Sequence, residues 1–446
     1  MERSGELYFD DVLLFADTVV VEQMAEDVWL VISVETANWI VLYTPFQRVL
    51  LENLIEGKSV GTVSQMIETG DEMGQLQALL SALTAREFAV LHHKPNPQYA
   101  EGYKMLNLYV TNACNLRCKH CFMWSGVKLK EELRIEDWLR ILTDFKNNGG
   151  EYVTFSGGEP LMNKDFPSLV RHVAKLGLQA TILSNGLLWT DVLIDELADS
   201  ISEIQFSIDG VDEESNAKLR GEDHFDKVVD SVIRFANKGV RVSVATTFTF
   251  DNLQDDISER YQQLIDEIKS RTAYPVFFKL SKKVLSGRDV QYTAEENARF
   301  SEKINAIERS IDENASYQNF MEGHHPNFVM RNCGFGGISV GADGKVYFCN
   351  RISEVEDYGN IREQSFASFI QRAKEIHEQT AVEHVEPCAH CELRYICGGG
   401  CRIDDFDFAG KLKNKGTIIH QTSCTPEKKR RLMQKMVDSF TYYYQF

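Results

Sequence analysis

Three cysteines, Cys114, Cys118 and Cys121, are the residues most clearly arranged for chemistry in this chain. They follow the spacing CxxxCxxC, and Phe122 comes directly after them. Structural zinc sites need four ligands, and CxxC knuckles usually occur in pairs. A 4Fe–4S cluster is normally held by four thiolates, so a loop with three leaves one iron open to a small molecule. The spacing therefore predicts an iron–sulfur cluster with one free coordination position.

The other seven cysteines lie in the last quarter of the chain. Gly344 and Cys349 form a GxxxxC pattern, and a CxxCx5CxxxC run begins at Cys388. The full set is Cys333, Cys349, Cys388, Cys391, Cys397, Cys401 and Cys424. In a chain without a signal peptide, such short spacings indicate metal ligands and not disulfides. Zinc stays open as an alternative for the CxxC pairs, although three ligands would close no structural zinc site.

Length and charge limit the classes of function. A chain of 446 residues is too long for one compact core, so two or three domains are expected. The net charge is 48 − 66 = −18, which disfavours nonspecific binding to nucleic acid or to an anionic membrane. No apolar run is long enough to span a membrane, and the N-terminus has no signal-peptide pattern. We therefore expect a cytoplasmic protein without nucleic-acid or membrane partners.

Strand and helix patterns alternate downstream of a predicted strand at 105–111, which ends at the cysteine loop. This alternation is typical of a parallel α/β barrel, whose functional residues follow the carboxyl ends of the strands. The further strands are predicted at 152–156, 178–184, 203–208, 240–249 and 275–280, and the helices at 134–147, 166–175, 191–198, 225–238 and 256–269.

Polar and glycine residues follow the second, third and fourth predicted strands. Adjacent glycines allow close approach of a ligand, and a carboxylate can accept hydrogen bonds from an ammonium group. For the third and fourth strand ends, ordinary turn residues with side-chain-to-backbone bonds are the alternative interpretation. The candidate binding residues are Gly157, Gly158, Glu159, Ser184, Asn185, Ser207, Asp209 and, farther along the chain, Arg220.

Together, the CxxxCxxC loop and the GGEP motif at 157–160 resemble the radical S-adenosylmethionine (SAM) superfamily. The resemblance implies a partial (β/α)6 barrel, with the open iron binding the SAM amine and carboxylate and Phe122 near the adenine. It implies that Glu159 meets the SAM ammonium, that the residues of the third and fourth strand ends contact its ribose and carboxylate, and that Arg220 also contacts SAM. An electron donor such as flavodoxin or ferredoxin would start cleavage to a 5′-deoxyadenosyl radical, which takes a hydrogen atom from the substrate.

The seven later cysteines resemble, in their order, the auxiliary-cluster (SPASM) domain of radical SAM enzymes. By this resemblance Cys388, Cys391, Cys397 and Cys424 hold a distal 4Fe–4S cluster. Cys333, Cys349 and Cys401 hold a proximal one. The expected cofactors are therefore SAM and three 4Fe–4S clusters.

The first part of the chain resembles a winged-helix unit. Strand patterns at 28–32 and 39–43 precede helical patterns at 45–56 and 73–88, with a short helix capped by Ser59 between them. The pattern is similar to the precursor-recognition element of enzymes that modify ribosomal peptides, in which a leader peptide adds a strand to the sheet edge. A scaffold domain or a DNA-binding winged helix is the alternative, and the absence of a basic stripe argues against DNA.

These observations predict an α/β protein with four segments: a winged-helix-like leader-recognition domain at 1–95, a linker at 96–104, a radical SAM partial barrel at 105–320 and a SPASM domain with a C-terminal helix at 321–446. We expect the aromatics of that helix to pack on the barrel, and His120, His324 and His325 to be bystanders.

The chain is thus expected to be a radical SAM maturase that cross-links a precursor peptide. All ten cysteines are used by clusters, so no thiol is left to return a hydrogen atom to a substrate radical. A thioether is favoured, with a carbon–carbon cross-link close behind. The alternatives are a peptide epimerase, a zinc-binding peptide adaptor without catalysis, and a formylglycine-forming sulfatase-maturing enzyme. Against the last, Asn350 follows Cys349, where those relatives have an aspartate.

Overall fold

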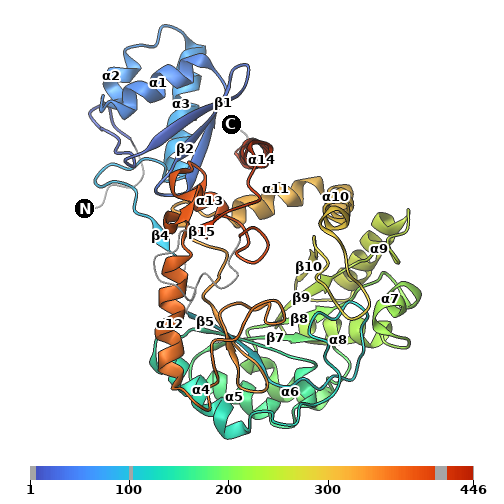
Figure 1. Cartoon of the computed structure of the whole chain (residues 1–446). Helices are drawn as coiled ribbons and strands as arrows, with labels where there is room; N and C mark the ends of the chain where they lie inside the picture. Colours follow the sequence, from blue (N-terminus) through green and yellow to red (C-terminus); the bar gives the residue numbers. More distant parts are fainter. Residues whose placement is uncertain (1–6, 100–103, 407–418, 445–446) are drawn as a thin grey trace. The chain divides into compact units, whose positions relative to one another are not determined.

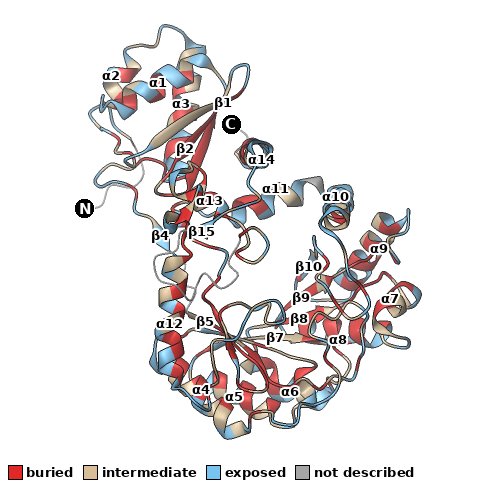
Figure 2. Ribbon diagram, in the orientation of Figure 1, coloured by how far each residue is buried: buried red, intermediate tan, exposed pale blue. Residues whose placement is uncertain are grey.

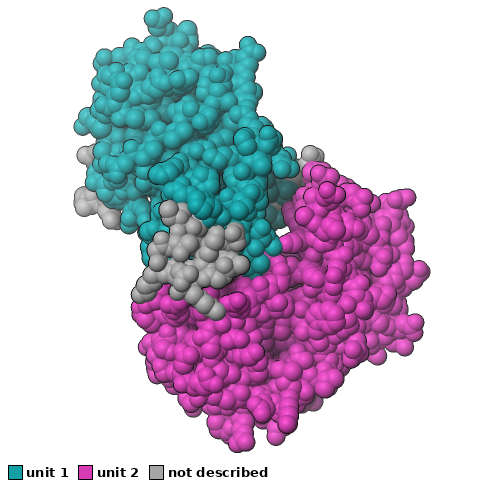
Figure 3. Space-filling model, viewed as in Figure 1, with its two compact units in different colours: residues 1–101, 314–333, 378–446 teal, residues 102–313, 334–377 magenta. Residues whose placement is uncertain are grey.

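The computed structural model describes residues 7–99, 104–406 and 419–444 (Figure 1). The chain forms two compact units, coloured separately in Figure 3. Unit 1 contains residues 1–101, 314–333 and 378–446, and unit 2 contains residues 102–313 and 334–377. Residues of the predicted SPASM segment thus belong to both units. Residues 100–103 of the predicted linker lie outside the described part of the chain.

Unit 1 is built on a three-stranded antiparallel sheet in the order β1 (Val19–Ala25), β2 (Val28–Ser33) and β3 (Asn38–Leu42). Three helices follow: α1 (Pro45–Ile55), α2 (Val60–Ser64) and α3 (Gly70–Ala85). Thr44, Ser59 and Thr69 cap them by accepting backbone N–H bonds in the first turn. This order agrees with the winged-helix-like pattern, to which the structure adds the strand β1.

The later segments of unit 1 are β4 (Gln98–Tyr99), paired with β11 (Phe328–Val329), then β14 (Val385–Glu386) with β15 (Ile419–His420), α13 (Arg394–Cys397) and α14 (Pro426–Tyr443). Of these, β11, α13 and α14 contribute residues to the core of the three-stranded sheet. The buried residues Met433, Met436, Val437 and Phe440 of α14 belong to the same apolar cluster as Trp39. Trp39 Nε1 also donates to Met436 O at 3.2 Å.

The expectation that the aromatics of the C-terminal helix pack on the barrel was therefore wrong. The face of the antiparallel sheet is rich in large apolar side chains, and burying it against α14 removes both apolar surfaces from water.

Unit 2 contains the parallel sheet that the alternating pattern predicts. Its order is β10-β9-β8-β7-β6-β5-β12-β13, and β5 to β10 are successive parallel neighbours. The strands are β5 (Met105–Tyr109), β6 (Tyr152–Ser156), β7 (Gln179–Ser184), β8 (Glu203–Ser207), β9 (Arg241–Thr246), β10 (Val276–Leu280), β12 (Ile338–Val340) and β13 (Val346–Tyr347).

Helices connect these strands and cover the sheet. Those between successive strands are α4 (Ile135–Asn147), α5 (Phe166–Lys175), α6 (Asp191–Leu197), α7 (Glu213–Arg220), α8 (Phe225–Asn237) and α9 (Ile257–Ser270). Farther along are α10 (Ala294–Ile311) and α12 (Phe366–Gln379), whereas α11 (Glu313–Glu322) belongs to unit 1 from residue 314 on and contributes Phe320 and Met321 to its core. Burial is concentrated in the strands and on the helix faces toward them (Figure 2). The sheet is open, because β10 is an edge strand and does not pair with β5.

In the described part of the chain, no helix has the length and apolar character needed to cross a membrane.

Candidate cofactor site

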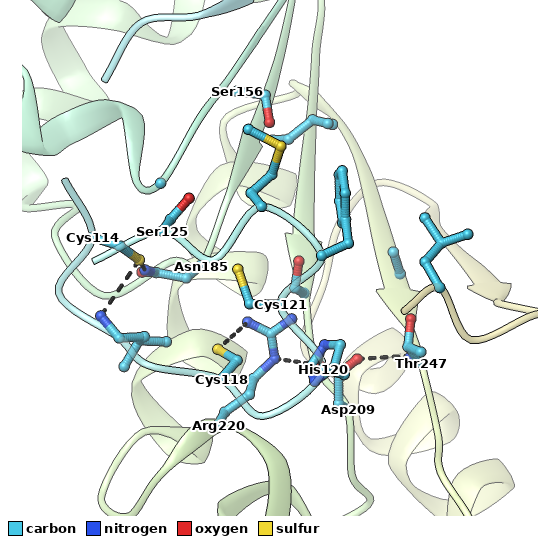
Figure 4. Close-up of a pocket in the computed structure, with 18 of the residues that line it drawn as sticks. Cys114, Cys118, His120, Cys121, Ser125, Ser156, Asn185, Asp209, Arg220 and Thr247 are labelled. Carbon is cyan, nitrogen blue, oxygen red and sulfur yellow. Dashed lines mark hydrogen bonds and ion pairs between the residues drawn. The ribbon is translucent and has the colours of Figure 1, made fainter. Parts of the chain in front are cut away.

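A pocket of about 380 Å³ lies where β5 to β10 end in unit 2. Loops after six strands contribute to it, as expected for a parallel barrel. Of the predicted cofactor residues, it is lined by Cys114, Cys118, Cys121, Phe122, Gly157, Gly158, Ser184, Asn185, Ser207, Asp209 and Arg220. Figure 4 shows the cysteine loop and the polar residues that surround it.

Backbone hydrogen bonds give the cysteine loop its shape. Cys114 N donates to Gly126 O at 3.2 Å, and Gly126 N donates to Asn112 O at 2.9 Å. The Glu132 carboxylate accepts from Thr111 Oγ1 and from Asn112 N. The start and the end of the loop are therefore tied together, and the three cysteines lie between these ties.

Two glycines of the GGEP motif allow the β6 loop to approach the cysteine loop. A Cβ atom on Gly157 would lie 2.4 Å from Thr111 O, and one on Gly158 would lie 2.1 Å from Ala113 O. Both distances are far below van der Waals contact with atoms of the backbone, which cannot move aside easily. Gly157 also has φ of 133°, which L-residues with a side chain rarely adopt.

Asp209, Arg220 and His120 form a charged cluster at the wall of the pocket. Asp209 Oδ2 accepts from Arg220 Nε at 2.5 Å and lies 3.0 Å from His120 Nε2. Thr247 N donates to the other carboxylate oxygen at 2.7 Å. Burial alone would raise the pKa of Asp209, but Arg220 and His120 hold it well below its usual range.

Arg220 also reaches the cysteine loop, because its Nη1 lies 3.9 Å from Cys118 Sγ. Figure 4 shows the guanidinium between Cys118 and Asp209. His120, which we expected to be a bystander and not a ligand, lines the pocket and contacts Asp209. Its position between two cysteines that line the pocket was the available signal in the sequence.

Glu159 lies behind the pocket and does not line it. Only 1% of this residue is exposed, and its two carboxylate oxygens accept from Ser184 Oγ at 2.9 Å and Asn185 N at 2.8 Å. Burial raises the pKa of Glu159 to about 7. In this arrangement Glu159 orients the third strand end, whose Ser184 and Asn185 line the pocket.

The donor set fits an iron–sulfur cluster. Burial raises the pKa of Cys114 to about 11 and also raises that of Cys118, so both are neutral thiols without a metal. Metal binding takes up thiolates and releases the protons. In the described residues, no three cysteine, histidine or carboxylate groups converge on one metal ion. In a 4Fe–4S cluster each cysteine thiolate binds a different iron, so the cysteines need not converge on one point.

In unit 1 the four cysteines predicted for the distal cluster lie near one another. Burial is the main reason that the pKa of Cys388 is raised to about 11; Arg402 opposes this rise, and the neighbouring Cys397, Cys391 and Cys424 thiols add to it. Arg402 is fully buried beside this set, where Nε donates to Thr380 O at 2.8 Å and Nη1 donates to Gly398 O and Gly400 O.

Cys333 and Cys401, predicted for the proximal cluster, are hydrogen-bonded neighbours in unit 1, and this bond raises the pKa of Cys401. Arg402 N also lies 3.5 Å from Cys333 Sγ. Cys349 belongs to unit 2, where its Sγ lies 3.7 Å from Asn350 Oδ1. Its membership of the proximal set remains a prediction.

Comparisons with known proteins agree with this site. The radical SAM superfamily model matches residues 108–264, and the SPASM model, an iron-sulfur cluster-binding domain, matches residues 332–392. An AdoMet-dependent heme synthase of Oleidesulfovibrio alaskensis is 26% identical over 334 residues, covering 68% of this chain and 83% of the relative. Mycofactocin maturase MftC of Mycolicibacterium smegmatis is 26% identical over 334 residues, covering 70% and 83%.

Among solved structures, Streptococcus suis SuiB bound to the precursor peptide SuiA matches with a TM-score of 0.50 and 15% identity, over 92% of this chain and 99% of SuiB. This likeness is one of fold. The two family matches cover the cysteine loop with the pocket-forming strands, and several of the later cysteines. Residues 108–264 therefore form a radical SAM domain and residues 332–392 a SPASM iron–sulfur cluster-binding domain, and the chain is a SAM-dependent enzyme.

Proposed function

We propose that this enzyme oxidatively cross-links a ribosomally made precursor peptide, whose leader segment binds the N-terminal domain. SAM bound at the cluster of Cys114, Cys118 and Cys121, with an electron from a donor such as flavodoxin or ferredoxin, supplies a 5′-deoxyadenosyl radical that removes a hydrogen atom from a substrate carbon. Asp209 and Arg220 hold the cysteine loop and the wall of the pocket in place for that step. The likeness in fold to peptide-bound SuiB and the match to a peptide maturase, MftC, support this proposal.

A groove in unit 1 is the main observation that supports a peptide as the substrate. It has a volume of about 670 Å³ and runs between the end of β3, helix α3 and the last turn of α14. Gly70, Gly74, Ala78 and Ala82 line it at four-residue intervals along α3. Residues at this spacing share one face of a helix, and their small size leaves room for an additional segment beside β3.

β3 is an edge strand of the sheet, and Val41 in this strand lines the groove. The outward N–H groups of Trp39 and Tyr43 donate to the side chains of Asn38 at 2.9 Å and Gln47 at 2.8 Å. Val41 has the same orientation, because alternate residues of a strand point their N–H and C=O to the same side. The N–H and C=O of Val41 therefore point away from β2, and the residue is only 3% exposed. An added peptide strand would satisfy both groups.

The assignment of all ten cysteines to clusters bears on which bond is formed in the peptide. With all ten cysteines assigned to clusters, no protein thiol remains to return a hydrogen atom to the substrate radical. An auxiliary cluster would accept the electron from the substrate radical, and the attacking side chain of the substrate would lose its proton to solvent as the new bond forms. We favour a thioether from a substrate cysteine, with a carbon–carbon bond as the second choice.

Binding of the peptide is tested with point variants in the groove. Deleting residues 1–95 is unsuitable, because it would expose the apolar face of α14 that packs on the sheet. Gly74→Leu places a side chain in the groove, and its Cβ meets no atom within 4 Å. The matched control is Gln77→Leu, on the exposed side of α3.

The probe is a labelled peptide from a short open reading frame beside the gene, measured by fluorescence anisotropy. We expect Gly74→Leu to weaken binding at least about tenfold and Gln77→Leu to bind as the wild type does. Equal binding by all three proteins would refute the groove as the leader site.

The reaction is tested by mass spectrometry of the peptide after incubation with SAM and a reductant. A cross-linked product is lighter by one H2, whereas epimerisation in heavy water adds deuterium without changing connectivity. The second candidate is an iron porphyrin substrate, favoured by the heme synthase match over 68% of the chain. Unchanged peptide together with turnover of an added iron porphyrin would support that candidate.

A further inference from the structure

The segment from Lys283 to Val290, here called the strap, joins the two ends of the run of strands from β5 to β10. It follows β10, the last of these six strands, and contacts the cysteine loop, which follows β5, the first of the six. Asp289 N donates to Lys119 O at 2.6 Å. A Cβ atom on Gly287 would lie 2.5 Å from the carbonyl carbon of His120, so strap and loop are in direct backbone contact.

Arg288 makes the central contact between the strap and the cysteine loop. Its Nη1 donates to Cys118 O at 2.9 Å, and its Nη2 donates to Ser125 O. Cys118 lies on the outgoing side of the loop and Ser125 on the returning side, with Cys121 between them. One rigid guanidinium therefore sets the separation of the two sides of the loop.

The strap itself is anchored and forms part of the pocket. Val284 is 2% exposed, and its N–H donates to Asn297 Oδ1 of α10 at 3.0 Å. Lys283, Val284 and Leu285 line the cofactor pocket together with the cysteines. The same segment thus forms a wall of the pocket and holds the loop that carries the cluster ligands.

We propose that Arg288 is a positioning residue for the SAM-binding cluster. It closes the open barrel at the carboxyl ends of its strands and keeps the cysteine loop in the shape that binds the cluster. The arginine touches neither the reacting atoms nor a cysteine sulfur, so its effect is exerted through the backbone of the loop.

The test compares Arg288→Met and Arg288→Lys with Arg241→Met in the reconstituted full-length enzyme. Arg241 stacks on Phe277 at 5.1 Å at the amino end of β9 and serves as the matched control. Hydrogen exchange reports on residues 112–126. Electron paramagnetic resonance, with iron release to a chelator, reports on each cluster. The KM for SAM and kcat are measured from SAM cleavage without peptide.

For Arg288→Met we expect at least about tenfold faster exchange in residues 112–126, because two charge-assisted hydrogen bonds are lost. We also expect iron release from the SAM-site cluster alone and a KM for SAM raised about tenfold with a smaller change in kcat. Arg288→Lys should be intermediate, since a lysine provides a single charged nitrogen instead of a planar fork. Unchanged exchange and unchanged KM in Arg288→Met would overturn the proposal. So would faster exchange of equal size in β7, which would indicate general destabilisation.

Discussion

Replacing Asp209 with asparagine tests the charged cluster at the pocket wall. Asp209 is 1% exposed and receives hydrogen bonds from the guanidinium of Arg220 and from Thr247 N. Asparagine keeps the size and an acceptor oxygen but removes the charge. It leaves the Arg220 guanidinium, whose side chain is only 11% exposed, without its counterion. Breaking a buried pair in this way costs about 3–5 kcal/mol.

This loss converts to a shift in melting temperature of unit 2. For a unit of this size, each kcal/mol lowers the melting temperature by about 2–4 °C, so the expected fall is about 6–20 °C. Scanning calorimetry at a fixed rate under anaerobic conditions measures it. Asp195→Asn is the control, because Asp195 pairs with Lys238 on the surface, and this variant should melt nearly as the wild type does. The double variant Asp209→Asn with Arg220→Met removes both charges and should melt above the single variant.

The pH dependence gives an independent check. The folded-state pKa of Asp209 lies below its ordinary value of 3.8, so its contribution to stability is complete above that pH and is lost as the pH falls toward the folded-state value. The difference in stability between wild type and Asp209→Asn should therefore be constant near neutral pH and shrink below about pH 4. A fall in melting temperature no larger than that of Asp195→Asn, or a difference independent of pH, would refute the reasoning.

Two further predictions concern the cysteine sites. After anaerobic reconstitution we expect about twelve iron and twelve sulfide per chain, and changing Cys114, Cys118 and Cys121 to alanine should abolish SAM cleavage but leave about eight iron. Eight or fewer iron in the wild type would contradict two auxiliary clusters. Arg402→Met should destabilise unit 1 by about 3 kcal/mol or more, because three buried carbonyl groups lose their donor. Arg430→Met, which removes a more exposed arginine that also donates to carbonyl groups, is the control, and equal unfolding of the two variants in urea would contradict this account.

Local patterns in the sequence were sufficient for the elements and for the chemistry of the cysteines. The strands β5 to β10 agree with the predicted ranges to within a few residues at each end. The same holds for the helices α4, α5, α6, α8 and α9 that connect them. Alternating apolar residues, caps and glycines act over short distances, so they can be read from neighbouring residues. The three cysteines within one loop were identifiable for the same reason, since a single short loop brings them together whatever the rest of the chain does.

Contacts between distant parts of the chain were decided only by the tertiary structure. Periodicity predicts that α14 has an apolar face, but several apolar surfaces could have covered it, and the three-stranded sheet does so instead of the barrel. The ion pair of His120 with Asp209 and the two bonds of Arg288 to the cysteine loop join residues from different strand ends. The hydrogen bonds that Glu159 accepts from Ser184 and Asn185 also join two strand ends. Such contacts depend on how the strands are ordered in the sheet and on which groups burial leaves in need of a partner, and neither is a property of a local segment.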